Sequence, residues 1–143
     1  MYVQDYDEAI PAYYVGNYYA HQLLDPYIKN TQIWKCPSGG HTGGSGIGYG
    51  YNCYYLGFWR TDLPANAEML GDITYPSECF VFAEGKGWAY SEPPGVEDDR
   101  MSFDRHNEGA NYSFADGHAK WLGKSTVYCK KWPAVPDWYL AVR

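Results

Sequence analysis

A short Asp-Gly turn between two β-type runs constrains the fold of this chain more than any other feature. Residues 110–114 precede Ala115-Asp116-Gly117, and residues 118–122 follow it. Asp-Gly between two alternating runs is typical of the tight turn of a β-hairpin, where the backbone needs residues that tolerate positive φ. We therefore predict an antiparallel hairpin late in the chain.

The remaining elements are predicted to be short. A compact run of β-forming residues at 79–83 indicates another strand, and the alternating tyrosines that begin at Tyr49 indicate a further one. A helix is expected over residues 16–24, because its apolar positions recur at helical spacing. With 143 residues, 16 Gly and 9 Pro, the chain is expected to form one domain, 1–143, rich in turns.

Charge and hydropathy exclude several classes of function. The net charge of −6 and the pI near 5.0 argue against nucleic acid as a partner, because phosphates require a basic surface. No apolar run approaches the roughly 18–20 residues of a membrane helix. The first residues also lack the basic and apolar regions of a signal peptide. We therefore expect no membrane partner for this chain.

Four cysteines, at positions 36, 53, 79 and 129, leave two interpretations open. An even number in a small domain is compatible with two disulfides and an oxidising compartment. The pairing that we favour joins Cys36 to Cys53 and Cys79 to Cys129. The alternative is a set of free buried thiols. Zinc-finger spacing is absent, because no two cysteines are separated by two to four residues.

The segment from His106 to Gly117 has a specific pattern: a histidine, nine residues, then Asp-Gly. This pattern resembles the H-X9-DG signature of the prepilin-type, processing-associated domain of bacterial pilin-like proteins, which are similar to the pseudopilins of type II secretion. Other segments match in the same order: residues 2–8, 24–30, 34–38, 49–52 and 75–77. The resemblance therefore spans most of the chain.

The resemblance implies an α+β pilin-like head, in which an N-terminal helix packs on an antiparallel sheet of about four strands with long loops. Residues 1–8 resemble the end of a longer helix, so the chain is expected to be a soluble head in which that helix is truncated. Other pilin-like subunits or the secretion machinery would be the partners of the intact protein. Its location would be periplasmic, at the cell surface or extracellular.

The resemblance also suggests calcium, because major pseudopilins hold this ion in a late loop of the head. Calcium takes six to eight oxygen ligands. A transition metal would instead favour His106 and His118 with Asp116. The alternatives to metal binding are purely structural roles: a solvated acidic loop, a His106 that anchors the loop by hydrogen bonds, and an Asp116 that only shapes the turn. Candidate calcium ligands are Glu97, Asp98, Asp99, Asp104 and Asp116, with Glu84 on the neighbouring strand.

Three functions are compatible with these residues. The favoured hypothesis is a structural or assembly role as a calcium-stabilised, pseudopilin-like head. The alternative is a calcium-dependent hydrolase of a small ester or lactone, such as an acyl lactone, in which His106 or His118 acts as general base and Glu84 orients a metal-activated water. A third hypothesis is carbohydrate binding through stacked Tyr and Trp side chains. The aromatic candidates are Tyr54, Trp59 and Trp88.

Overall fold

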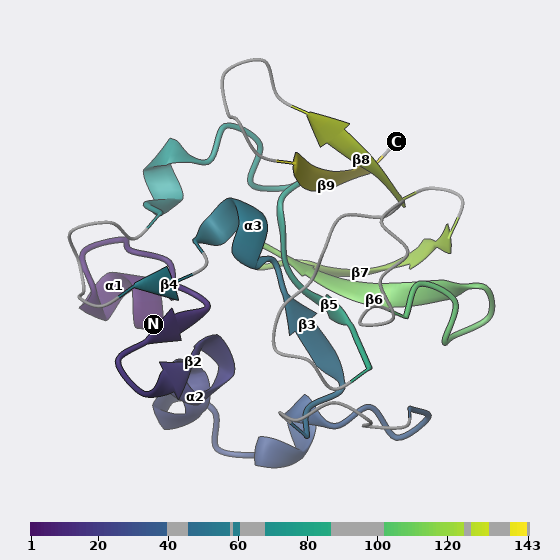
Figure 1. The fold of residues 1–143 in the computed structure, drawn as a ribbon, viewed down its shortest axis with the longest axis horizontal. Coiled ribbons are helices and arrows are strands. Elements are labelled where there is room, and N and C mark those ends of the chain that lie inside the picture. Colours follow the sequence, from purple (N-terminus) through teal and green to yellow (C-terminus); the bar gives the residue numbers. More distant parts are fainter. Residues whose placement is uncertain are drawn as a thin grey trace.

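The computed structural model has an α+β fold, as predicted, with short helices and mainly antiparallel sheets (Figure 1). It describes residues 1–39, 46–57, 59–60, 68–86, 102–124, 127–131 and 138–142. Within these ranges, no helix has both the length and the apolar character that crossing a membrane requires.

A four-stranded antiparallel sheet in the order β3-β5-β6-β7 forms the centre of the fold. The predicted hairpin is confirmed: β6 and β7 pair in continuous register from Gly109–Gly123 to Ser113–Ala119, on either side of the Asp-Gly turn. The predicted strand at 79–83 is also confirmed, with its bounds shifted by one residue. The strands are β3 (Tyr49–Tyr51), β5 (Phe80–Glu84), β6 (Gly109–Phe114) and β7 (Ala119–Gly123).

The two faces of this sheet carry two separate cores. Alternation along β6 buries Ala110, Tyr112 and Phe114 on one face, where they pack with Phe80, Ala83 and Leu122. Asn111 and Ser113 lie on the other face, which the N-terminal third of the chain covers in part. A register shift between Phe80 and Phe82 in β5 is the irregularity that places the buried Phe80 in one core and the partly buried Phe82 against the other.

The N-terminal elements supply the second core, in which Trp34 packs against Phe82 and the Phe82 ring contacts Tyr51. A three-stranded sheet in the order β2-β1-β4 lies beside α2, and β4 (Trp59–Arg60) runs parallel to β1 in it. The elements before residue 40 are α1 (Tyr2–Asp5), β1 (Tyr14–Val15), β2 (Tyr18–Tyr19), α2 (Ala20–Leu24), and the 3-10 turns η1 (Asp25–Tyr27) and η2 (Thr31–Trp34).

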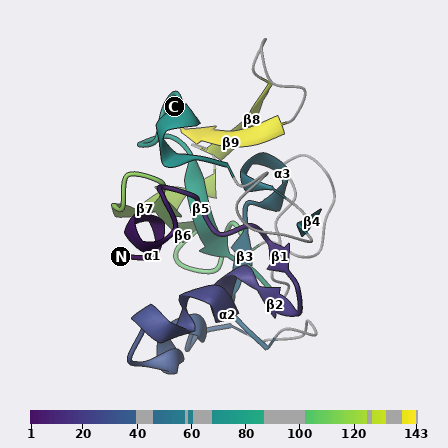
Figure 2. The same cartoon turned by 90° about the vertical axis from the view of Figure 1, so that its left-hand side faces the viewer.

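The last two strands, β8 and β9, form a separate antiparallel hairpin. Figures 1 and 2 both place this hairpin at the opposite end of the molecule from α2. The remaining elements are α3 (Cys53–Leu56), β4 (Trp59–Arg60), η3 (Leu70–Asp72), β8 (Val127–Lys131) and β9 (Trp138–Val142).

Three predicted elements are shorter than expected. The helix at residues 1–8 ends at Asp5, because Asp7 and Glu8 have φ of 52° and 66° and cannot continue it. The helix expected over 16–24 begins only at Ala20, since the preceding residues pair as β1 and β2. The aromatic strand ends at Tyr51, and the chain then turns into α3.

The two predicted disulfides are not formed. Cys36 and Cys79 are buried free thiols, which excludes both the Cys36–Cys53 and the Cys79–Cys129 pairing. Burial raises the pKa of the Cys79 thiol to about 12, which disfavours the thiolate that reacts with oxidants. The interpretation as buried thiols therefore holds for these two positions.

Candidate functional site

The structure places the two ends of the His-X9-Asp-Gly segment at opposite ends of strand β6. His106 precedes β6, and Asp116 and Gly117 lie in the turn that follows it. At about 3.3 Å per residue, six residues of strand separate these ends by roughly 20 Å. His106 and His118 therefore belong to two different surroundings rather than to one site.

A tight turn presents His106. Its backbone N–H donates to the carbonyl of Gly109 at 2.9 Å, and the Gly109 N–H donates back at 3.2 Å. The two intervening residues, Asn107 and Glu108, both have positive φ, as in the hairpin turns that match strand twist. The indole N–H of Trp121 donates to the His106 carbonyl at 2.8 Å and holds the turn against β7.

The His106 ring meets two side chains from distant parts of the chain. Its Nε2 atom lies 2.8 Å from Oε1 of Glu84 and 3.4 Å from Sγ of Cys36. Cys36 and Glu84 are 3% and 1% exposed, whereas the His106 side chain retains 27% of its accessible surface. The potential ligand atoms of all three residues lie within 4.8 Å of one another. We call these three residues the Cys36–Glu84–His106 group.

Glu84 is the buried centre of the group. The side-chain amide of Asn111 donates to its Oε1 at 2.6 Å, and its own carbonyl accepts the Ser102 N–H at 3.1 Å. Its second carboxylate oxygen, Oε2, is buried and has no hydrogen-bond partner among the described residues. A buried polar atom of this kind is rare in folded proteins, because its desolvation is not offset.

Arg105 holds the backbone next to the group. Its guanidinium donates to the carbonyl of Gly48 at 3.2 Å and to that of Gly85 at 2.5 Å. The guanidinium also packs against Gly39, where an added Cβ would lie 2.6 Å from the Arg105 Cζ atom. Arg105 thereby joins the loop after Cys36 to the ends of β3 and β5.

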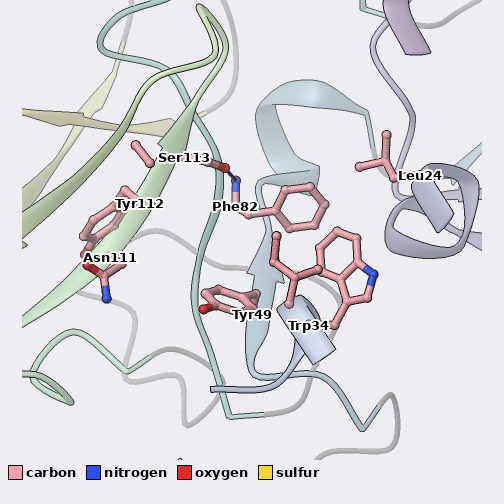
Figure 3. A pocket seen from close by; sticks show the side chains of 9 residues that line it. Leu24, Trp34, Tyr49, Phe82, Asn111, Tyr112 and Ser113 are labelled. Carbon is pink, nitrogen blue, oxygen red and sulfur yellow. Dashed lines mark hydrogen bonds between the residues drawn. The ribbon is translucent and has the colours of Figure 1, made fainter. Parts of the chain in front are cut away.

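Figure 3 shows side chains that line a mostly apolar cavity of about 320 Å³. Tyr49 and Asn111 line this cavity and also flank Glu84, since Tyr49 is the register partner of Glu84 and Asn111 is its hydrogen-bond donor. Burial raises the pKa of Tyr49, and the nearby Glu84 and Cys36 raise it further. The other lining residues are Leu24, Ile33, Trp34, Phe82, Tyr112, Ser113 and Ala119.

The Asp116 end of the hairpin is local and exposed. Oδ1 of Asp116 accepts the His118 N–H at 3.1 Å and lies 2.6 Å from the His118 ring nitrogen Nδ1. The backbone N–H of His118, followed by its side chain, lowers the pKa of the Asp116 carboxyl. The His118 ring stacks on Phe114 at 4.3 Å between centroids. These contacts serve the turn, as Asp-Gly turns require.

The described members of the predicted calcium set are not brought together. Asp104 lies beside Lys124, 3.3 Å from its Nζ, at the end of the hairpin opposite to Asp116. No single ion can contact both carboxylates. The other three predicted ligands, Glu97, Asp98 and Asp99, lie outside the described residues, as does Trp88; the side chains of Tyr54 and Trp59 are likewise not described.

Sequence reasoning named Glu84 and His106 as members of one site, and the structure brings this pair together. It missed Cys36, which it assigned to a disulfide, and it added His118, which lies elsewhere. Sulfur, imidazole and carboxylate donors together suit a transition-metal ion better than calcium. No protein-family model, no curated protein and no solved structure matches this chain.

Proposed function

We propose that this chain is the globular head of a pilin-like subunit with a structural role in an assembly. The proposal rests on the resemblance of its sequence segments to the H-X9-DG family, and one structural observation supports it. Several of the segments that carry the resemblance contact one another, as expected if these residues maintain a common scaffold.

The N-terminal contacts begin this series. The Tyr27 hydroxyl donates to Asp5 Oδ2 at 2.7 Å, which joins segment 2–8 to segment 24–30. The indole N–H of Trp34 donates to Asp25 Oδ1 at 3.0 Å, which joins segment 24–30 to segment 34–38.

The later contacts extend the series to the central sheet. Cys36 in segment 34–38 lies against His106, and the Asp116 N–H donates to the carbonyl of Pro76 at 3.4 Å. Both ends of the His-X9-Asp-Gly segment are thus anchored on other family-like segments. Residues with such contacts stabilise a fold, and this supports a scaffold role more directly than a catalytic one.

Photo-crosslinking in the producing cells tests the assembly role. Tyr18 and Tyr75 are 59% and 45% exposed, so a photoreactive amino acid at either position leaves the core intact. Pilin-like subunits or secretion components at the cell surface should be the dominant crosslinked partners, with unirradiated cells as the control. Crosslinks only to unrelated abundant proteins would contradict the assembly role.

Calcium stabilisation is part of the proposal for the acidic segment that includes Glu97, Asp98, Asp99 and Asp104, without Asp116. The Asp104 carboxylate is half exposed and faces one lysine, so an added cation can reach it. Calcium should raise the unfolding temperature relative to EDTA, and Asp104→Asn should reduce that increase. Equal unfolding temperatures with calcium and EDTA would remove calcium from the proposal.

Hydrolysis of an ester or lactone is the second candidate, favoured by one observation. The His106–Glu84 pair adjoins a cavity whose largely apolar lining suits an acyl chain, with the Asn111 amide nearby to orient a carbonyl. The partly exposed His106 would accept a proton from water, and Glu84 would orient its ring. A bound divalent ion would supply Lewis-acid activation of that water.

Turnover measurements decide this second candidate. A chromogenic ester and an acyl lactone are incubated with the chain in calcium and then in excess EDTA. The hydrolase hypothesis predicts turnover that EDTA removes and that His106→Ala abolishes, while His118→Ala at the other end of the hairpin retains it. Equal rates for His106→Ala and the unmodified chain would exclude this site as the source of activity.

A further inference from the structure

Three side chains with metal-binding atoms converge from three different elements. Cys36 follows η2, Glu84 ends β5, and His106 lies in the turn before β6. Cys36 and His106 are 70 positions apart in the chain. We propose that Cys36, Glu84 and His106 bind one divalent transition-metal ion of the zinc type. This inference does not depend on the assembly role.

The shared nitrogen of His106 is the first argument. Both the Cys36 sulfur and a Glu84 oxygen approach the same Nε2 atom, at 3.4 Å and 2.8 Å. A neutral imidazole nitrogen either donates one hydrogen or accepts one, so Nε2 can form a full hydrogen bond with only one of the Cys36 sulfur and the Glu84 carboxylate. A metal ion between the three side chains would accept an electron pair from a ligand atom of each.

The unsatisfied oxygen of Glu84 is the second, independent argument. Its side chain is inaccessible to solvent, and Oε2 lacks a hydrogen-bond partner among the described residues. Arg105, the cation beside the group, directs its hydrogen bonds to the carbonyls of Gly48 and Gly85. A buried carboxylate requires a partner to offset its desolvation, and a cation at the group provides one.

Charge and donor type define the ion. A Cys36 thiolate and a Glu84 carboxylate carry two negative charges, which a divalent cation neutralises. Thiolate and imidazole ligands favour zinc and neighbouring transition metals over calcium and magnesium, which take oxygen ligands. Three protein ligands leave the fourth position of a tetrahedral ion open to water.

The distances permit such an ion with little movement. Zinc–ligand bonds of about 2.0–2.3 Å at tetrahedral angles place neighbouring ligand atoms about 3.4–3.6 Å apart. The separation between sulfur and Nε2 already has this value, and the separation between Nε2 and Oε1 has to open by roughly half an ångström.

Outer contacts hold the ligands in position, as metal sites require. The Asn111 amide donates to Glu84 Oε1, and the Trp121 indole holds the His106 carbonyl. Neither contact uses the potential ligand atoms Nε2 of His106 and Sγ of Cys36.

Cobalt(II) is a direct probe, because a cobalt–thiolate bond produces a near-ultraviolet charge-transfer absorption. The chain is reduced, freed of metal by a chelator and titrated with Co²⁺. We expect a charge-transfer band that saturates at one equivalent, visible bands of a tetrahedral ion, and loss of both when Zn²⁺ is added.

Variants assign the signal to the group. Cys36→Ser should abolish the charge-transfer band, and Glu84→Gln and His106→Ala should each weaken Co²⁺ binding at least about 100-fold, beyond the 10–100-fold effect of outer contacts. Cys79→Ser and His118→Ala are the matched controls, since Cys79 is another buried free thiol and His118 lies at the other end of the hairpin. Both should bind as the unmodified chain does.

Two outcomes would overturn the proposal. One is the absence of a thiolate band at one equivalent of Co²⁺ in protein whose near-ultraviolet circular dichroism shows intact packing. The other is an unchanged band in folded Cys36→Ser. Because Glu84→Gln preserves side-chain size, loss of binding in that variant with an unchanged dichroism spectrum separates metal coordination from a general effect on folding.

Discussion

The two ends of strand β6 hold the two halves of one sequence pattern, and these halves differ in their contacts and in their burial. At the first end, His106 contacts Cys36 and Glu84, which come from distant parts of the chain and are almost completely buried. At the second end, Asp116 contacts His118, two positions away, and both side chains are more than one third exposed. One half of the pattern organises tertiary structure, and the other shapes a turn.

This difference teaches that closeness in sequence does not assign the pattern to one site. Two polar residues at opposite ends of an extended strand lie far apart in space, although they are close in sequence. Substitutions at the His106 end should therefore affect global stability and metal binding, whereas those at the Asp116 end should have smaller, local effects.

Replacement of Glu84 should have the largest effect. Glu84→Ala leaves the Asn111 amide and the His106 ring without their buried acceptor, and we expect the free energy of unfolding to fall by about 3 kcal/mol. Urea unfolding in the presence of EDTA measures this without a contribution from bound metal. Asp104→Ala, which removes an exposed ion pair, is the control and should change stability by less than about 0.5 kcal/mol. Equal losses in both variants would mean that the buried contacts of Glu84 stabilise the chain no more than an exposed ion pair does.

A pair of glycine substitutions compares the two turns. A Cβ at Gly109 would lie 2.4 Å from the Trp121 ring and 2.5 Å from the Leu122 carbonyl, so Gly109→Ala should reduce the free energy of unfolding by about 2 kcal/mol. Gly117 has φ of +92° and open space around it, so Gly117→Ala should lose only about 1 kcal/mol through backbone strain. A lower denaturant midpoint for Gly117→Ala than for Gly109→Ala would show that the turn at Gly117 contributes more to stability.

Loss of the His118 ring should have a smaller effect. His118→Ala removes the stack on the buried Phe114 and the contact with Asp116, and because the His118 side chain is itself 39% exposed we expect a loss of about 0.5 kcal/mol. Thermal unfolding at neutral pH measures this loss. A loss as large as that of Glu84→Ala would mean that this end also supports the core.

The smallest expected effect is the pH dependence contributed by Asp116. In the folded chain, the pKa of this carboxyl lies below its ordinary value of 3.8. The carboxylate therefore contributes its full stabilisation above pH 3.8, and this stabilisation is lost as the pH falls through the pKa of the folded chain. Asp116→Asn should therefore show a shallower loss of stability below about pH 4 than the unmodified chain. Urea midpoints between neutral and strongly acidic pH test this, and parallel curves would contradict it.

Local signals in the sequence predicted the central part of the fold. The Asp-Gly turn and the β-forming run at 79–83 identified β5, β6 and β7, because strand propensity and turn chemistry act over a few residues. The helix over 16–24 failed at its start, since Gly16 has φ of +59° and the tyrosines on either side of it pair as β1 and β2. Tertiary pairing overrode the helical spacing of the apolar residues there.

The site was predicted only in part for a different reason. Glu84 and His106 were recognised as polar residues beside predicted strands. Cys36 was not, because its contact with His106 depends on the path of the chain between them and no local pattern encodes that path. An even number of cysteines favoured disulfides, yet the buried Cys36 thiol faces an imidazole rather than another sulfur.

The Asp116-Gly117 turn also affects the order in which the chain folds. The β6–β7 hairpin closes over a few residues, whereas Cys36 has to await a partner 70 positions later, and closing so long a loop is slower. The hairpin should therefore form early and dock afterwards on the N-terminal third. During synthesis, the Cys36 thiol leaves the ribosome long before His106 does, so the newly made chain passes through an interval in which this sulfur is open to oxidants from which its burial in the finished fold protects it.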